Sequence, residues 1–393
     1  MVKPTLLSLF TGAGGLDLGF ESAGFQIVGA IEKDETARDT LVLNRPNWPV
    51  LDIDDVVEYA PHASPSDFGL SRGELDVLAG GPPCQPFSMA AQWRDRGRLG
   101  LYDRRAECLD AMLDVIAELQ PRVVVVENVP GFVSRPRSGL ARLRGGLDQI
   151  RRRTGVGYEL RHAVLSADAY GVPQLRRRAF VIATRAGIGV EWPEPTHLER
   201  PIRSGDALAG CDSGNVVRAS GKWADLLPSI PAGSNYLFHT PSGGGEPLFG
   251  SRTRFWSFLL KLDPARPAWT LSATPGPATG PFHWKNRPLS PEELARLQTF
   301  PREWRFHGAR GQVVKQIGNA TPPLLAEVVA RRVAQALGAR VPKELANSIA
   351  RVSRLAAAPI PGRVPSKYLS LRAGHSAHPG HGLGPKPRRH KVW

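Results

Sequence analysis

The sequence predicts an α/β fold, in which a doubly wound and mostly parallel sheet is accompanied by a second, smaller and irregular domain. Strand-length apolar segments alternate with helical patterns through the first half of the chain. Residues 122–126 contain four consecutive valines, which is typical of a strand buried on both faces. After about Arg185 the residues Pro, Gly, Ser and Trp become frequent and helical periodicity fades, which indicates a change of domain.

The expected strands share a run of apolar residues that ends at turn-forming residues. They cover residues 5–10, 25–31, 75–79, 122–126 and 179–184. Helices are expected from about Leu16, over residues 108–119 and 291–300, and from the prolines at 322–323 to about Leu337. The last of these begins at proline, which suits the first turn of a helix.

The same patterns predict how the chain divides. We expect residues 1–185 and 312–340 to form one discontinuous domain, because the apolar pattern returns near Gln312. Residues 186–311 would form the second domain. Residues 341–393 would be a basic tail, largely disordered after about residue 356, where apolar residues become few.

Composition and charge narrow the class of protein. With 41% hydrophobic and 22% charged residues, the chain has the composition of a soluble globular protein. Its net charge is +15, and residues 341–393 hold ten Lys or Arg against one acidic residue. A polyanionic partner explains this charge, although a solubilising tail would explain the tail equally well.

The cellular compartment follows from cysteine usage and the absence of apolar runs. Three widely separated cysteines argue against a disulfide framework or a zinc site and favour a reducing compartment. No apolar run reaches membrane-spanning length, and the first motif begins at Phe10, so we expect no signal peptide. We therefore expect a cytoplasmic protein that does not bind a membrane.

The most informative segment is Gly-Gly-Pro-Pro-Cys-Gln-Pro-Phe-Ser at residues 80–88, directly after an expected strand. Prolines restrict φ and remove backbone donors, so Cys84 is held on a stiff loop. Open α/β sheets bind ligands at this end of their strands. A thiolate there is a candidate nucleophile whose adducts can later be eliminated, whereas the alternative is a buried structural cysteine.

A glycine-rich turn at residues 10–17 reads Phe-Thr-Gly-Ala-Gly-Gly-Leu-Asp and lets a ligand approach the backbone. A dinucleotide fingerprint would place glycine where Asp17 stands, so nicotinamide cofactors are disfavoured. Glu32 ends the second strand at the distance that suits ribose hydroxyls. These features favour a nucleoside ligand without a pyrophosphate, and a purely structural turn remains the alternative.

Two further polar segments flank later strands. Glu127, in Glu-Asn-Val at residues 127–129, ends the valine strand, where its carboxyl group is sheltered from water. Arg176 and Arg178 are two apart in an extended segment and would share one face, which suits a phosphate or a base carbonyl. The alternative for Glu127 is a carboxylate that caps the next turn. The alternative for the two arginines is an exposed basic edge.

Taken together and in this order, these motifs resemble those of the cytosine-C5 DNA methyltransferases. Six segments carry the resemblance, between about residues 5 and 335. They are Phe10–Gly15, Pro83–Gln85, Glu127–Val129, Gln174-x-Arg176-x-Arg178, Arg266–Thr270 and Gln316–Ala320. Residues 341–393 match no part of the family pattern.

The resemblance implies a class I S-adenosylmethionine-dependent methyltransferase fold and a chemistry for each motif. Cys84 would add to C6 of a cytosine flipped out of duplex DNA, and Glu127 would bind N3 and the exocyclic amine. Arg178 would contact the base carbonyl, with Arg176 supporting the site. No metal is implied. The implied residues of the S-adenosyl-L-methionine site are Phe10, Gly12, Gly14, Gly15, Leu16, Glu32, Asp52, Ile53, Pro82 and Asn319.

The resemblance also implies a DNA interface and a biological role. Residues 88–105 would form a loop that closes over DNA, and residues 186–285 would choose the target sequence. The candidate DNA-binding residues are Gln85, Ser88, Arg94, Arg98, Arg252 and Arg254. We expect a monomeric modification enzyme of a prokaryotic restriction–modification system, with a cognate endonuclease as a functional partner, and a solitary methyltransferase is the alternative.

Three rival functions remain to be weighed. The transfer-RNA methylating branch of the family usually carries Cys-Phe-Thr, and here Cys84 precedes Gln, Cys108 precedes Leu and Cys211 precedes Asp. A catalytically dead DNA-binding module is disfavoured by the presence of both Cys84 and Glu127. A nicotinamide dehydrogenase is disfavoured by the spacing of the glycines.

Overall fold

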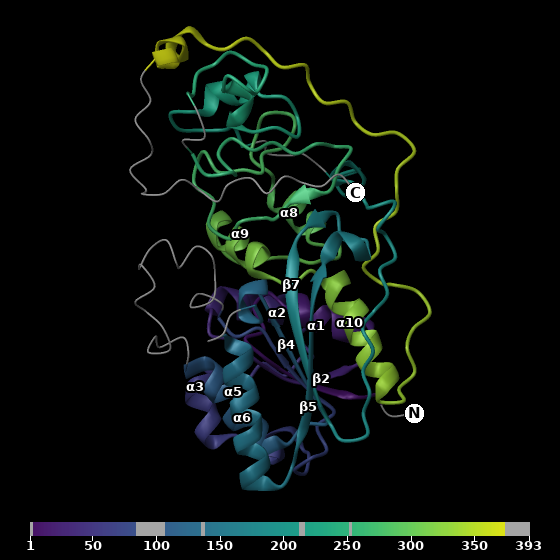
Figure 1. Cartoon of the computed structure of the whole chain (residues 1–393). Helices are drawn as coiled ribbons and strands as arrows, with labels where there is room; N and C mark the ends of the chain where they lie inside the picture. Colours follow the sequence, from purple (N-terminus) through teal and green to yellow (C-terminus); the bar gives the residue numbers. More distant parts are fainter. Residues whose placement is uncertain (1–2, 84–106, 135–137, 212–216, 251–253, 374–393) are drawn as a thin grey trace.

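The computed structural model describes residues 3–83, 107–134, 138–211, 217–250 and 254–373 (Figure 1). None of the helices in these ranges has the length and apolarity that a bilayer crossing requires. Some of the residues singled out from the sequence lie outside the described ranges. They are Cys84, Gln85, Ser88, Arg94, Arg98 and Arg252.

A six-stranded sheet forms the centre of the larger domain, in the order β2-β1-β3-β4-β7-β5. Its strands are β1 (Thr5–Leu9), β2 (Gln26–Ile31), β3 (Val77–Gly80), β4 (Val123–Asn128), β5 (Tyr158–Ser166) and β7 (Arg177–Arg185). The first four are parallel, while β7 runs antiparallel to both β4 and β5. This mixed sheet confirms the predicted α/β class.

The strand β5 was not predicted from the sequence. It lies at the edge of the sheet, and exposed residues interrupt its pattern, as at Glu159, Arg161 and His162. A strand with one free edge needs no continuous apolar run, so its signal is weaker than that of β4, which is buried throughout.

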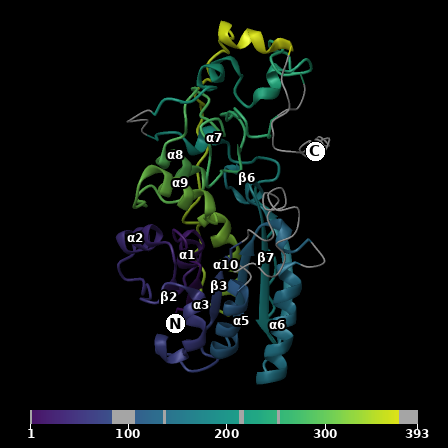
Figure 2. The ribbon, with the colours of Figure 1, turned by 90° about the vertical axis from the view of Figure 1, so that its left-hand side faces the viewer.

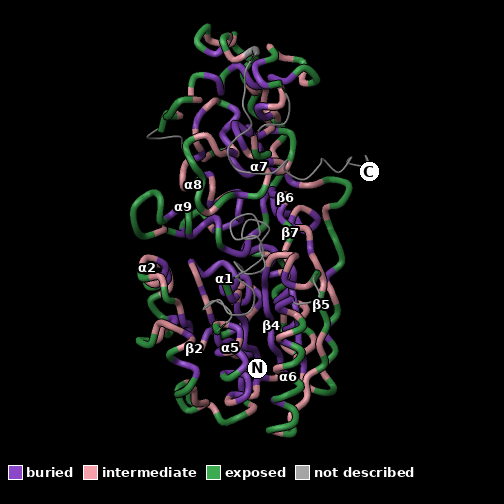
Figure 3. The backbone as a smooth tube through the Cα atoms, turned by 60° about the vertical axis from the view of Figure 1, so that its left-hand side comes forward, coloured by how far each residue is buried: buried purple, intermediate pink, exposed green. Residues whose placement is uncertain are grey.

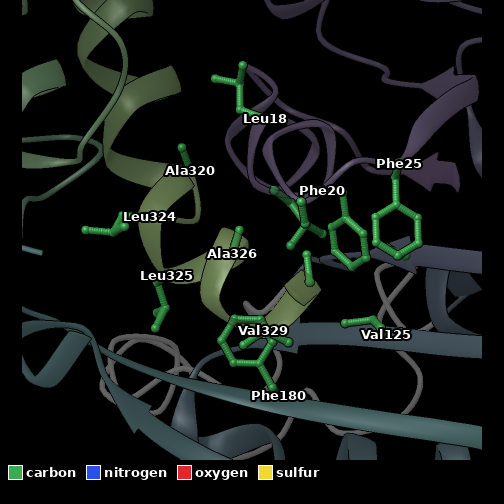
Figure 4. Close-up of a cluster of buried hydrophobic side chains, with 14 of the residues drawn as sticks. Leu18, Phe20, Phe25, Val125, Phe180, Ala320, Leu324, Leu325, Ala326 and Val329 are labelled. Carbon is green, nitrogen blue, oxygen red and sulfur yellow. The ribbon is translucent and has the colours of Figure 1, made fainter. Parts of the chain in front are cut away.

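Helices cover both faces of the sheet (Figures 1 and 2). One face carries α1 (Gly15–Ser22) and α10 (Pro323–Ala336), whose apolar side chains share a core with Val125 and Phe180 (Figure 4). The other face carries α3 (Val56–Tyr59), α5 (Glu107–Leu119) and α6 (Gly139–Thr154). Figure 3 shows the buried strands between these two layers.

Short elements complete the larger domain and connect it to the second domain. They are α2 (Glu35–Asn44), α9 (Arg310–Asn319), and the 3₁₀ helices η1 (Ala60–His62), η2 (Pro65–Phe68), η4 (Pro130–Phe132) and η5 (Ala167–Tyr170). A two-residue parallel ladder between β6 (Gln174–Leu175) and β8 (Ala268–Trp269) joins the two domains.

The second domain is irregular, as the sequence predicts. Its elements are α7 (Ser204–Ala207), η6 (Ala224–Ser229), η7 (Tyr236–His239) and α8 (Pro291–Leu297). Two small apolar cores hold it together, one around Leu262 and Trp284 and the other around Tyr236 and Phe258. The side chains of Ala295, Phe300 and Trp304 instead join the core of the sheet domain, so the packing changes before residue 311.

The chain after α10 also differs from the sequence-based expectation. The sequence predicts disorder after about residue 356, yet the structure describes the chain as far as residue 373. It ends in the 3₁₀ helix η8 (Ser366–Ala373), and Tyr368 is buried in the second domain.

The contact between α1 and α10 depends on Gly19. A Cβ atom at this position would lie 2.4 Å from Ala326 Cβ and 2.4 Å from the backbone nitrogen of Glu327. The two helices could not approach this closely with a larger residue.

Gly19→Ala is expected to destabilise the fold by about 1–3 kcal/mol, because the added methyl group forces the two packed helices apart. Gly145→Ala is the matched control, since Gly145 lies in α6 with no atom within 4 Å of the added Cβ. The control should stabilise the fold by about 0.5–1 kcal/mol. Urea unfolding measures both values, and equal effects would contradict the packing argument.

Candidate active site

A cavity of about 510 Å³ opens at the carboxyl ends of β1, β2, β3 and β4. Parallel strands bring their C-terminal residues to one edge of the sheet, so segments far apart in sequence meet there. The residues singled out from the sequence that line it are Phe10, Gly12, Gly15, Leu16, Glu32, Pro82, Glu127, Arg178 and Asn319.

The glycine turn forms the floor of the cavity through unusual backbone angles. Phe10, Gly12 and Gly14 have φ values of 56°, 58° and 79°. A Cβ at Gly12 would meet no protein atom within 4 Å, so this part of the backbone is open to a ligand. A Cβ at Gly15 would lie 2.3 Å from the carbonyl oxygen of Thr321, which fixes the turn against the segment after α9.

Glu32 closes the turn from the end of β2. Its Oε2 accepts a hydrogen bond of 2.6 Å from the Gly12 amide, and its Oε1 accepts one of 2.7 Å from the Asp34 amide. Burial raises the pKa of this carboxyl group. The carboxylate thus holds the glycine turn while facing the cavity.

Glu127 and Arg178 form an ion pair across the antiparallel β4–β7 contact. Arg178 Nε lies 2.9 Å from Glu127 Oε1, and both side chains are largely buried. The next residue, Asn128, donates a hydrogen bond of 2.9 Å to the carbonyl oxygen of Pro82. This bond ties the end of β4 to the loop that leads into Cys84, and Pro82 and Pro83 line the same cavity as Glu127.

Arg176 does not share the environment of Arg178, which corrects the expectation that the two residues grip one group. The Arg176 amide donates to the carbonyl of Gln174, a tight turn that breaks the strand between β6 and β7. Its side chain is therefore turned inward and is fully buried. Its Nη2 donates hydrogen bonds of 2.9 Å to the carbonyl oxygens of both Gly318 and Ala320.

Arg176 consequently acts on the site through its neighbours. The two carbonyls that it binds flank Asn319, which lines the cavity. Gln298 binds the same segment, because its Nε2 donates to Ile317 O at 2.6 Å and to Ala320 O at 3.1 Å. Gln174 completes the group by donating to Gln298 Oε1 at 2.7 Å.

Three predicted cofactor residues do not line the cavity. Gly14 lies beneath the turn, where a Cβ would be 2.9 Å from the side chain of Leu41. Asp52 and Ile53 are exposed, and the cavity is lined two residues later in the chain by Asp54 and Asp55. A loop has no periodicity from which this displacement could be predicted.

Other lining residues were missed by the sequence analysis. Lys33 pairs with Asp55, and Lys315 Nζ lies 2.7 Å from Asp34 Oδ2. Cys108 lines the cavity from the first turn of α5, and burial raises the pKa of its thiol. Lys33 directly follows Glu32 in the sequence, which is the one signal that could have identified it.

Arg254 is a predicted DNA-binding residue that lies in the described part of the second domain. Its guanidinium lies over aromatic rings, 5.8 Å from the centroid of Trp223 and 5.7 Å from that of Phe258. These contacts hold the side chain against the domain core. The described residues contain no group of three or more His, Cys, Asp or Glu side chains that could bind a metal ion.

A family model and individual proteins of similar sequence point to the same family. A family model described as C-5 cytosine-specific DNA methylase matches residues 5–210 and 266–335. The Type II methyltransferase M.SacI of Streptomyces achromogenes is 37% identical, with 85% of this chain and 93% of that protein covered. The Type II methyltransferase M.PspPI of a Psychrobacter species is 34% identical, with 87% and 81% covered.

Solved structures share the fold. The crystal structure of a putative DNA modification methyltransferase encoded within an Escherichia coli prophage has a TM-score of 0.59 at 24% identity. It covers 85% of this chain and 99% of its own. The Dnmt2 methyltransferase of S. pombe has a TM-score of 0.54 at 18% identity, with 86% and 99% covered.

Asp17 lies in the first turn of α1, directly after the glycine turn, and is fully buried. Burial raises the pKa of its carboxyl group to about 7. The folded protein therefore binds this proton more tightly than the unfolded chain, whose aspartates titrate near 4. Between about pH 4 and pH 7 the free energy of unfolding falls as pH rises, because ionisation of Asp17 opposes folding.

Asp17→Asn is expected to remove this contribution. The difference in free energy of unfolding between the variant and the unchanged protein should shift in favour of the variant by on the order of 2 kcal/mol from pH 5 to pH 8. Chemical unfolding at the two pH values measures the difference. Asp148→Asn on the exposed face of α6 is the control and should show no such gain. An equal effect of Asp17→Asn at both pH values would exclude a protonated Asp17.

Proposed function

The chain belongs to the C-5 cytosine-specific DNA methylases, and we propose that its cavity binds S-adenosyl-L-methionine beside a cytosine flipped out of duplex DNA. The observation that carries this proposal is the meeting of three elements at one cavity. These are the open glycine turn, the Glu127–Arg178 pair and the prolines that precede Cys84. The family match and the similarity to Type II methyltransferases support a DNA cytosine methyltransferase over a transfer-RNA enzyme or an inactive binding module.

The described residues fit S-adenosyl-L-methionine. The backbone at Gly12 is open to a ligand, whereas Gly15 is closed against Thr321, so the turn offers one exposed edge. The cavity combines carboxylates of Glu32, Asp54 and Asp55 with apolar side chains such as Phe10. A ligand that carries cationic groups and a nucleoside suits this mixture of acidic and aromatic groups.

We assign Glu32 to the ribose hydroxyls and Phe10, Leu16, Pro82 and Asn319 to the walls of the cofactor site. Arg176 positions Asn319 through the carbonyls of Gly318 and Ala320. When bound, the cofactor supplies an electrophilic methyl group to C5 of the base.

The residues of this chain prepare the base for that transfer. The Cys84 thiolate would form a bond to C6 of cytosine, and the electron pair of the C5–C6 double bond would shift toward C5, which makes C5 nucleophilic. Glu127 would hydrogen-bond N3 and the exocyclic amine, while Arg178 would contact the base carbonyl. After methylation, the proton on C5 would leave to a base, and the C6–sulfur bond would break to restore the ring.

The DNA would lie across the junction of the two domains. The target cytosine must leave the stack to reach Glu127, at a cost of a few kcal/mol. We assign choice of the target sequence to the second domain and contacts with the DNA to Gln85, Ser88, Arg94, Arg98, Arg252 and Arg254. All of these except Arg254 lie outside the described ranges.

The biological role follows the Type II enzymes to which the chain is similar. We propose a monomeric modification enzyme that acts in the cytoplasm and protects host DNA from a cognate restriction endonuclease. Bisulfite sequencing of host DNA after expression would identify the methylated sequence.

The test of the reaction is methyl incorporation from labelled S-adenosyl-L-methionine into duplex DNA and into transfer RNA. Duplex DNA alone should be labelled. Cys84→Ser should reduce incorporation to background, because the serine hydroxyl stays protonated and is a poor nucleophile. Glu127→Gln should reduce kcat by roughly 10²–10⁴-fold, because a group that stabilises the activated base is lost.

Glu159→Gln is the matched control, since Glu159 is exposed on β5 away from the cavity. Its kcat should equal that of the unchanged enzyme. Full incorporation by Cys84→Ser would remove this residue from the mechanism, and labelling of transfer RNA alone would overturn the proposed substrate.

A further inference from the structure

Residues 341–373 lie beyond the region that the family model matches, which ends at residue 335. We call this segment the C-terminal strap. It leaves the end of α10, follows one side of the molecule and reaches the far end of the second domain at η8 (Figures 1 and 2). It is anchored at three levels.

The lower anchor is Glu327 on α10, whose side chain is fully buried. Its Oε1 accepts a hydrogen bond of 3.0 Å from the Ala346 amide, and its Oε2 accepts bonds from the amide and the side chain of Asn347 at 3.3 and 3.2 Å. Arg331 Nη2 lies 2.9 Å from Glu327 Oε1. A buried carboxylate therefore fixes the start of the strap to the sheet domain.

The middle anchor lies on α7, at the start of the second domain. Asp206 Oδ1 accepts a hydrogen bond of 3.0 Å from the Val352 amide, and Arg203 Nη2 donates one of 3.1 Å to the Val352 carbonyl. Ile349 is buried in the core around Leu262. The strap thus joins this core through the side chain of Ile349 and the backbone of Val352, and Ala358 packs against the same core.

The upper anchor is Tyr368, which is buried in the second core of the domain. Its ring stacks on Trp223 with a centroid distance of 5.7 Å and an interplanar angle of 13°. Its hydroxyl group donates a hydrogen bond of 2.6 Å to the Lys222 carbonyl. The Gly362 amide adds a bond of 3.0 Å to the Pro228 carbonyl.

The upper core is built from loops and 3₁₀ helices, with little regular structure to fix its position. The strap is a single chain that connects this core to α10. Trp223, on which Tyr368 stacks, also contacts the guanidinium of Arg254. A displacement of Tyr368 would therefore act through the ring of Trp223 on Arg254, a candidate DNA-binding residue.

We propose that the C-terminal strap holds the second domain at a fixed distance from the catalytic cavity, with Tyr368 as a positioning residue for binding of the target DNA. This inference rests on the proposed function, in which DNA lies across the junction of the two domains. The strap does not contact the cavity, so cofactor binding and the chemical step are independent of it.

The first experiment compares Tyr368→Ala with Tyr368→Phe in the full-length enzyme. Tyr368→Ala should raise KM for duplex DNA by about three- to tenfold, the equivalent of one aromatic stacking contact. The kcat and the Kd for S-adenosyl-L-methionine should not change. Tyr368→Phe keeps the ring on Trp223 and should restore most of the affinity for DNA.

A merely structural role for Tyr368 gives a different result. A partly unfolded variant contains less active enzyme, so its apparent kcat would fall while KM stayed constant. That result, or an unchanged KM for Tyr368→Ala, would overturn the proposal.

The second experiment cuts the strap after the protein has folded. Ile360 lies between two prolines and is 91% exposed, so a cleavage site for a sequence-specific protease can be placed there. The uncut variant should have the DNA KM of the unchanged enzyme, and cutting should raise it several-fold with the cofactor Kd unchanged. An equal KM for DNA before and after cutting would overturn the proposed role of the strap. Absence of methyl transfer in the uncut enzyme would instead contradict the proposed function.

Discussion

The buried guanidinium of Arg176 is the contact on which the architecture of the site depends. A fully buried cation is costly unless hydrogen bonds satisfy its donors, and here one nitrogen binds the carbonyls of Gly318 and Ala320. Gln298 and Gln174 extend this group into a buried polar network. Because the network includes the end of α9, it fixes the wall of the cavity that contains Asn319.

The same network sets the relation between the two domains. Gln174 Oε1 accepts a hydrogen bond of 3.1 Å from the amide of Leu271, two residues after β8. A Cβ at Gly318 would lie 2.5 Å from Ala273 Cα, so the second domain packs directly against the α9 segment that Arg176 binds. One group of hydrogen bonds therefore holds both the cavity wall around Asn319 and the junction with the second domain, and the C-terminal strap adds an anchor at the far end of the second domain.

The sequence predicted the parts of the structure that local patterns determine. The valine run of β4 and the prolines that begin α10 specify buried strand and helix directly. The order of six motifs predicted the family. Three residues of these motifs, Glu127, Arg178 and Gly12, line one cavity in the structure. Non-local contacts escaped prediction: Arg176 is turned inward by a tight turn after Gln174, and Tyr368 is ordered by Trp223, which is far away in the sequence.

The most direct test of this account is the affinity for S-adenosyl-L-methionine, measured by calorimetry, of Arg176→Lys and Arg178→Lys. Lysine keeps the charge but cannot reproduce the hydrogen bonds of the guanidinium. We expect Arg176→Lys to weaken cofactor binding, because the segment around Asn319 loses its support, whereas Arg178→Lys should bind the cofactor normally but turn over slowly. Normal cofactor affinity in Arg176→Lys would contradict it.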